Sequence, residues 1–177
     1  MITLGVAARL AEEKGFEYLF EAMKRIESNI QLLVAGPIDP VGEEKYKNKI
    51  MKLIKKLDIN VRILGNLDQK KLKEFYKKID ILVLPSVNST ESFGMVQVEA
   101  MFQGTPVVAS NLPGVRIPIL KTKMGELAEP ENSESLARVI IEVYRNINTY
   151  RKRRQIALTT FDVNKSYEIY RDIILNI

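Results

Sequence analysis

The sequence predicts an α/β protein: a Rossmann-like, doubly wound parallel sheet of about six strands, with helices on both faces. Short apolar runs of strand length alternate with longer segments in which apolar residues recur every three or four positions. Turn residues follow several of these runs, as at Gly36-Pro37 and Gly65-Asn66. The length of 177 residues suits one domain that buries roughly 70% of its unfolded surface. We therefore expect a single domain built from βαβ units.

In the first half of the chain, the expected strands are short apolar runs over residues 2–8, 31–35 and 61–64. The helices between them are indicated by apolar positions three and four apart. In segment 16–26 these positions are Phe16, Leu19, Phe20, Met23 and Ile26, and in the Lys-rich segment 43–57 they are Tyr46, Ile50, Leu53, Ile54 and Leu57. A third helix is expected over residues 68–78, because Asp68 is a favourable N-cap residue.

In the second half, expected strands at 81–84 and 106–109 flank a helical pattern that runs from 93 to 101. The segment 110–123 contains Pro113-Gly114 and Pro118 and is expected to be a loop, followed by a short extended segment at 125–128. Ser133 opens a further helix, whose apolar positions are Leu136, Val139, Ile140 and Val143. Two more helices are expected over 150–160 and 165–177.

The composition restricts the chemistry that the chain can perform. It contains neither cysteine nor histidine, so thiolate chemistry and histidine acid–base catalysis are excluded. Catalysis would have to use carboxylates, Lys, Arg, Tyr or backbone donors. The sequence has no apolar run of transmembrane length and no signal-peptide pattern, so we expect a cytoplasmic protein. The net charge of +5 suits a phosphate-bearing ligand, a nucleic acid or an anionic membrane surface.

In a doubly wound sheet, ligands bind beyond the carboxyl ends of the strands. The loop after the first expected strand holds Arg9 and Lys14, whose cations can contact a phosphate but can equally be solvated charges. Gly36 follows the second strand and permits close backbone approach, and Asn66-Leu67 follows the third. Both of these patterns are also typical of ordinary turns.

The loop after the fourth expected strand has the strongest pattern. Segment 92–96 places free backbone N–H groups at a helix N-terminus, which favours an anion. Glu91 precedes this segment and Glu99 follows it, and carboxylates accept hydrogen bonds from hydroxyl groups. A nucleotide sugar has this distribution of phosphate and hydroxyl groups. The alternative is that Glu91 is an N-terminal helix charge and Glu99 a surface residue, although the neighbours of Glu99 are mostly apolar.

Motifs along nearly the whole chain resemble the C-terminal, donor-binding domain of glycosyltransferase family 4 enzymes, which have the two-domain GT-B fold. Glu91 and Glu99, separated by seven residues, resemble the E-x7-E motif of that family. The other matching segments are ARL (8–10) with Lys14-Gly15, LVAG (33–36), VRILG (61–65), DILVLPS (80–86), ESFG (91–94) and GTPVVA (104–109).

The resemblance implies a role for each matching residue. Arg9 and Lys14 would bind the donor diphosphate, Glu91 would hold hydroxyls of the transferred sugar, and Glu99 would hold the ribose hydroxyls. The oxygens of phosphate and sugar would be bound by Phe93, Gly94, Met95 and Val96, and the nucleobase would be flanked by Gly36, Asn66, Leu67 and Leu72. Transfer would proceed with retention, with no metal or cofactor required, because the cations would stabilise the leaving diphosphate.

The resemblance also implies a domain organisation. Residues 1–177 would form the donor-binding domain, with 165–177 as its closing helix, and the N-terminal acceptor domain is expected to be absent. The isolated chain would then bind donor weakly and catalyse little. We expect GDP-mannose or UDP-glucose as donor, and a glycan or lipid-linked acceptor bound by the other domain, in the synthesis of cell-surface glycans or glycolipids.

Other classes of protein remain open at this point. An epimerase acting on nucleotide sugars has the same fold, but we would expect it to carry acid–base carboxylates or histidine. A non-catalytic nucleotide-binding α/β module could also use the positive charge. We expect no nucleic-acid partner, because the lysines of segment 43–57 have little aromatic interleaving for base stacking. A solvated helix face or peripheral contact with an anionic membrane would explain those lysines.

Overall fold

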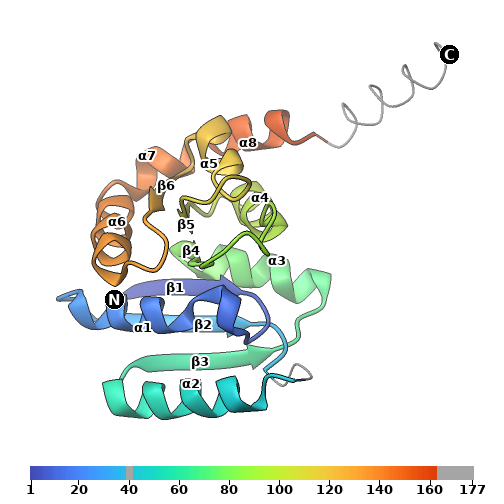
Figure 1. Ribbon diagram of the computed structural model, residues 1–177. Helices are drawn as coiled ribbons and strands as arrows, with labels where there is room; N and C mark the ends of the chain where they lie inside the picture. The colour runs from blue at the N-terminus through green and yellow to red at the C-terminus, as the bar shows by residue number, and fades with distance from the viewer. Residues whose placement is uncertain (39–41, 163–177) are drawn as a thin grey trace, which may run out of the picture.

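The computed structural model describes residues 1–38 and 42–162, which form a six-stranded, entirely parallel sheet with the order β3-β2-β1-β4-β5-β6 (Figure 1). This is the doubly wound order of a Rossmann-like fold, so the predicted fold class is confirmed. The strands are β1 (Ile2–Ala7), β2 (Ile30–Ala35), β3 (Asn60–Gly65), β4 (Ile81–Leu84), β5 (Val107–Ser110) and β6 (Gly125–Ala128).

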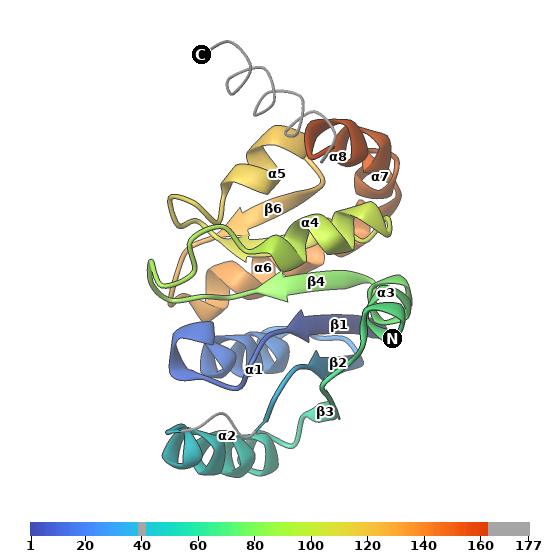
Figure 2. The same ribbon diagram turned by 90° about the vertical axis from the view of Figure 1, so that its right-hand side faces the viewer.

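Helices cover both faces of the sheet (Figures 1 and 2). One face packs against α1 (Phe16–Arg25), α2 (Glu44–Leu57) and α6 (Ser133–Arg145). The other face packs against α3 (Gln69–Lys78), α4 (Met95–Phe102), α5 (Ile117–Thr122) and α8 (Arg154–Thr160). A short 3-10 helix, η1 (Glu12–Lys14), precedes α1, and α7 (Ile147–Arg151) links α6 to α8.

The strand β4 shows how the sequence divides the core between the two faces. Its side chains are all buried, and they alternate between the two hydrophobic clusters. Ile81 and Val83 face the cluster under α1 and α6, whereas Leu82 and Leu84 face the cluster under α3 and α4. A parallel strand buried on both faces needs a continuous apolar run, which is what the sequence provides.

Two predictions about helices were wrong. The segment 110–123, expected to be a loop, contains α5. Pro118 lies in the first turn of this helix, where its missing N–H costs no hydrogen bond, so a residue taken as a loop signal is compatible with the helix start. The helix expected over 150–160 is divided between α7 and α8. The helix expected over 165–177 lies outside the described residues.

The carboxyl ends of the strands meet at one edge of the sheet. Ala7 pairs with Ala35, and Ala35 pairs in turn with Gly65. Backbone hydrogen bonds continue this alignment into the loops: Ala8 N donates to Ala35 O (2.9 Å), and Gly36 N donates to Gly65 O (2.9 Å). The loops after β1, β2 and β3 are therefore held side by side. Among the described residues, no helix combines the length and the apolar character needed to cross a lipid bilayer.

Gly36 and Gly65 give a matched test of this edge. Both have positive φ, of 137° and 69°, but a Cβ at Gly36 would lie 2.2 Å from Ala8 O, whereas a Cβ at Gly65 would meet nothing within 4 Å. We expect Gly65→Ala to lower the free energy of unfolding by about 1 kcal/mol. Gly36→Ala should lower it by about 3 kcal/mol or more, because strain and collision combine. Urea denaturation of both variants measures this, and equal losses would contradict the close approach.

Candidate functional site

The loop after β1 is attached to the loop between β4 and α4. Val87 N donates to Glu13 O (3.0 Å), which joins η1 to that second loop. Gly15 lies at the end of η1 with φ 65°, and a Cβ there would lie 2.1 Å from Pro85 O. Only glycine allows this approach, so the Lys-Gly pair in the sequence places Lys14 beside the residues that follow β4.

Each of the two expected phosphate-binding cations has a carboxylate partner. Lys14 Nζ donates to Glu91 Oε2 (2.8 Å), and both side chains are largely shielded, with 16% and 18% exposure. Arg9 is half-exposed and pairs with Glu13, four residues along the chain. The structure thus brings Lys14 and Glu91 together. An ammonium group has three donors, so the contact with Glu91 leaves Lys14 able to bind a further oxygen.

The N-terminus of α4 is held rigidly behind these residues. Gly94 caps the helix with φ 74°, and a Cβ at this position would lie 2.5 Å from Leu84 Cδ2 and 2.8 Å from Gln97 Nε2. The fully buried side chain of Gln97 donates through Nε2 to Phe93 O (3.0 Å) and to Val115 O (2.9 Å). Gln97 N donates to Gly94 O (2.9 Å), whereas the N–H groups of Met95 and Val96 have no acceptor within the helix and can bind an anion.

Glu99 lies one turn further along α4 and faces α3. Its Oε2 accepts a hydrogen bond from the buried hydroxyl of Tyr76 (2.8 Å). Both residues line a cavity of about 200 Å³, together with Leu72. The structure therefore brings together Glu99 and Leu72, which the resemblance assigns to the ribose and the nucleobase. Burial and then the hydrogen bond to Glu99 raise the pKa of Tyr76 far above its ordinary value, so the phenol stays protonated.

The remaining expected site residues differ in exposure. Asn66 and Met95 are exposed and available to a ligand. Leu67 and Val96 are partly buried and pack against the hydrophobic cluster on the α3 and α4 side of the sheet. These two residues therefore contribute to packing as well as to the rim of the expected site. Phe93 makes an edge-to-face contact with Phe161, at 6.0 Å between ring centroids.

Three residues at this edge were not singled out from the sequence: Glu13, Tyr76 and Gln97. Each acts through one of the expected site residues or through the loop that holds them. Glu13 lies in η1 whereas Arg9 lies before it in irregular backbone, so the four-residue spacing of a helix does not explain their pairing. No sequence spacing indicates the partners of Tyr76 and Gln97, because these partners depend on how α3 and α4 pack and on where the loop that contains Val115 lies.

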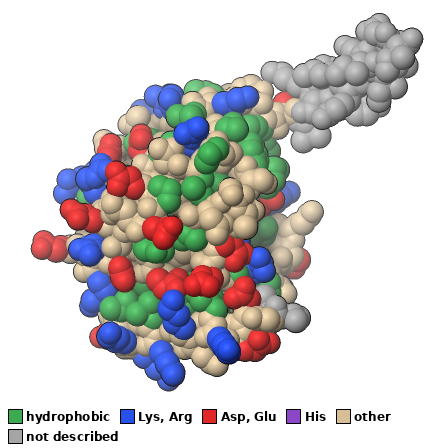
Figure 3. Space-filling model, viewed as in Figure 1, with side chains coloured by type: hydrophobic (Ala, Val, Ile, Leu, Met, Phe, Trp, Pro, Cys, Tyr) green, Lys and Arg blue, Asp and Glu red, His purple; other side chains and the backbone are tan. Residues whose placement is uncertain are grey.

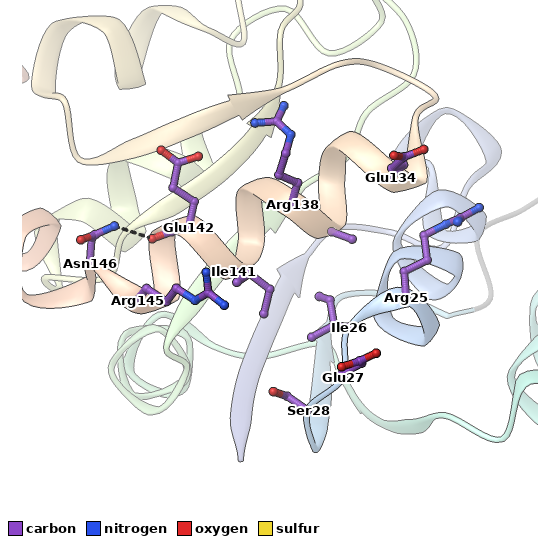
Figure 4. A pocket seen from close by; sticks show the side chains of 11 residues that line it. Arg25, Ile26, Glu27, Ser28, Glu134, Arg138, Ile141, Glu142, Arg145 and Asn146 are labelled. Carbon is purple, nitrogen blue, oxygen red and sulfur yellow. Dashed lines mark hydrogen bonds between the residues drawn. The ribbon is translucent and has the colours of Figure 1, made fainter.

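Two larger grooves lie outside the site, one beside it and the other away from it. One, of about 810 Å³, is lined by Arg9 and Glu13 and by Val87 and Thr90, so it adjoins the Arg9 side of the site. The other, of about 740 Å³, lies between α6 and the turn before β2 (Figure 4). Its wall at residues 26–28 leads into the amino end of β2, away from the edge where the expected ligand loops meet. Among the described residues, its arginines and glutamates form no ion pairs with one another.

The lysines of α2 form an exposed basic surface along the lower edge of the molecule in Figure 3. One of them, Lys49, is paired: its Nζ lies 2.7 Å from Glu17 Oε1, and the Tyr46 hydroxyl also donates to this carboxylate (2.5 Å). Burial acts to raise the pKa of Glu17, but these two hydrogen bonds outweigh it and the pKa lies below its ordinary value. Part of this basic surface is therefore neutralised within the protein.

The doubly wound sheet, with cations and carboxylates at its carboxyl edge, defines a Rossmann-like α/β domain with a candidate ligand site at that edge. Residues 2–159 match the model of the family described as glycosyl transferases group 1, and the chain belongs to this family.

Individual relatives agree with this assignment. The chain is 32% identical over 160 residues to the lipopolysaccharide 1,2-N-acetylglucosaminetransferase of Salmonella typhimurium, covering 85% of this chain and 40% of that protein. It is 32% identical over 136 residues to the phosphatidyl-myo-inositol mannosyltransferase of Mycobacterium leprae, covering 75% and 34%. The chain thus spans well under half the length of these relatives.

A solved structure shares the fold. The crystal structure of HepE from Anabaena in complex with UDP superposes with a TM-score of 0.90 at 26% identity, covering 99% of this chain and 49% of that one. The expected fold is therefore confirmed, and the family resemblance is confirmed at the level of group 1 glycosyltransferases.

The buried amide of Gln97 gives a test of the α4 N-terminus. In Gln97→Glu, a carboxylate would face the carbonyl oxygens of Phe93 and Val115, so we expect a loss of about 2 kcal/mol in the free energy of unfolding at pH 7. Burial would raise the pKa of this new carboxyl above its unfolded value of about 4.3. The protonated form keeps one donor. The penalty should therefore be smallest below about pH 4 and grow as the pH rises through the folded pKa.

Gln97→Met is the matched control, because it removes the amide without adding a titratable group. Its stability relative to the unsubstituted chain should not change with pH. Urea denaturation of all three proteins at a series of pH values measures both effects. A pH-independent penalty in Gln97→Glu would contradict the buried contacts assigned to Gln97.

Proposed function

We propose that this chain is the nucleotide-sugar donor-binding domain of a retaining, family 4 glycosyltransferase. The observation that carries the proposal is the Lys14–Glu91 pair beside the N-terminus of α4. It puts a cation, free backbone N–H groups and a carboxylate within one small region, which suits a sugar diphosphate. Glu99, on the next turn of α4, supplies an acceptor for the ribose hydroxyls.

Each residue has a defined part in the proposed transfer. Arg9 and Lys14 bind the diphosphate and stabilise the negative charge that develops as it leaves. Glu91 accepts hydrogen bonds from hydroxyls of the transferred sugar. The N–H groups from Gly94 to Val96 contact the phosphate and sugar oxygens. No metal is needed in this scheme, because the side-chain cations act on the leaving group.

The donor is proposed to be UDP-glucose or GDP-mannose. The HepE complex contains UDP, which supports a uridine nucleotide, and the mycobacterial relative is named a mannosyltransferase, which supports mannose as the transferred sugar. The acceptor is proposed to be a glycan or a lipid-linked sugar bound by a separate N-terminal domain. We propose a cytoplasmic location, with peripheral contact between the lysines of α2 and an anionic membrane.

A ligand-dependent melting experiment tests the proposal. One nucleoside diphosphate among UDP, GDP and ADP should raise the melting temperature of the chain selectively, because ligand that binds only the folded state stabilises it. The sugar derivative of the same nucleotide should act similarly, and EDTA should not reduce the shift. A shift with none of the nucleotides, in this chain and in a longer protein that contains it, would contradict donor binding.

Substitutions of Glu99 and Glu91 should have different effects on the binding of nucleotide and of nucleotide sugar. Glu99→Ala should weaken binding of the free nucleoside diphosphate by about 1–3 kcal/mol, because the ribose hydroxyls lose their acceptor. Glu91→Ala should not weaken binding of the free nucleoside diphosphate, but it should weaken binding of the nucleotide sugar. Titration calorimetry with both ligands measures the difference, and each variant is the control for the other. Equal losses of the free nucleotide in both variants would show that the roles are assigned wrongly.

A further inference from the structure

Tyr76 lies behind Glu99 and is fixed at two points. Its hydroxyl donates to Glu99 Oε2 (2.8 Å), and its backbone oxygen accepts a hydrogen bond from the buried hydroxyl of Thr105 (2.6 Å). The side chain is 1% exposed, and its ring packs edge-on against Phe75, at 5.4 Å between centroids. The Tyr76 hydroxyl, which donates a hydrogen bond to Glu99 from α3, is therefore held in a single, well-defined position.

The geometry leaves part of Glu99 available to a ligand. Tyr76 occupies Oε2, and Oε1 has no hydrogen-bond or ion-pair partner among the described residues. The carboxylate is only partly buried and lies on the wall of the 200 Å³ cavity shared with Leu72. A free glutamate has three rotatable side-chain bonds, and ordering them on ligand binding costs entropy. A carboxylate already held by a buried phenol avoids much of that cost.

We infer that Tyr76 is a positioning residue that fixes the carboxylate of Glu99 for ribose, so that the domain prefers ribonucleotides to 2′-deoxyribonucleotides. This inference rests on the proposed function and adds the residue that sets the sugar preference of the nucleoside site. In this proposal Tyr76 acts on the ligand through Glu99. It acts by keeping one oxygen of Glu99 oriented toward the two vicinal hydroxyls, a geometry that 2′-deoxyribose cannot satisfy.

The chain offers a matched control for removing the phenol. Tyr150 is also buried, and its hydroxyl donates to Glu126 Oε1 (3.0 Å) on β6. Tyr150→Phe therefore removes the same type of hydrogen bond from a carboxylate that is not part of the proposed site. Tyr76→Phe frees the carboxylate of Glu99, whereas Tyr150→Phe frees that of Glu126. Comparing the two variants therefore separates a general loss of stability from a loss of the fixed position of Glu99.

The experiment measures the affinities of UDP, GDP and their 2′-deoxy forms by titration calorimetry. For whichever base the unsubstituted chain binds, we expect the ribonucleotide to bind more tightly than its 2′-deoxy form. Tyr76→Phe should weaken the ribonucleotide by about tenfold and the 2′-deoxy form much less, so that the preference shrinks. Tyr150→Phe should leave the preference unchanged. Glu99→Asp, which retains the charge but cannot reach the same position, should reproduce the loss and serves if Tyr76→Phe does not fold.

The outcomes are distinct. Equal weakening of both nucleotide forms by Tyr76→Phe would show a merely structural role and overturn the inference, and so would an unchanged preference in Tyr76→Phe or, if that variant does not fold, in Glu99→Asp. In either case the proposed function would stand, since the unsubstituted chain still binds the nucleotide. Failure of the unsubstituted chain to bind any of the four nucleotides would instead overturn the proposed function and this inference with it.

Discussion

The candidate site depends on the parallel pairing of β1 with β4. Leu4 pairs with Ile81 and Gly5 with Leu82, although the two strands are separated in the chain by β2, β3 and their helices. This pairing is the point where the strand order reverses, because later strands add beyond β4 and earlier ones beyond β1. Loops that leave such a point diverge to opposite faces and leave a crevice between them. Lys14 and Glu91, 77 residues apart, meet there.

Glycine makes this meeting possible at close range. The backbone of Gly15 approaches Pro85 O, and that of Gly94 approaches Leu84, at distances that no Cβ would tolerate. Apolar strands bring the loops to the same edge, but the residues without side chains determine how near the loops come. The ion pair between Lys14 and Glu91 is therefore a consequence of backbone packing, and its contribution is to orient two side chains rather than to assemble the loops.

Much of this arrangement could be predicted from the sequence. The alternation of apolar runs and amphipathic segments was sufficient for the sheet and most helices, since burial on both faces forces that pattern on parallel strands. The helix α5 was missed because Pro118 is compatible with a first turn as well as with a loop. Glu91 and Glu99 could be chosen by their positions around a helix start. The roles assigned to them remain predictions, because no ligand contact has tested them.

The partners of those residues could not be predicted in the same way. Tyr76 is separated from Glu99 by 23 residues and belongs to a different helix, so their contact depends on the angle and distance at which α3 and α4 pack. A buried tyrosine in an amphipathic helix is fully explained by the core, and nothing in its spacing indicates a polar partner. The same holds for Gln97, whose two acceptors lie on loops before and after α4.

The different partners of the two glutamates bear on how the proposed site would respond to a donor. Glu91 is paired with a cation whose remaining ammonium donors can bind a diphosphate oxygen, so a bound diphosphate would share Lys14 with Glu91 and bring its negative charge close to that carboxylate. Glu99 is paired with a neutral phenol, which can remain in place while the free carboxylate oxygen accepts a ribose hydroxyl. The nucleoside end of the site is thus preorganised, whereas the cations at the phosphate end already have carboxylate partners, with which a bound diphosphate would share them.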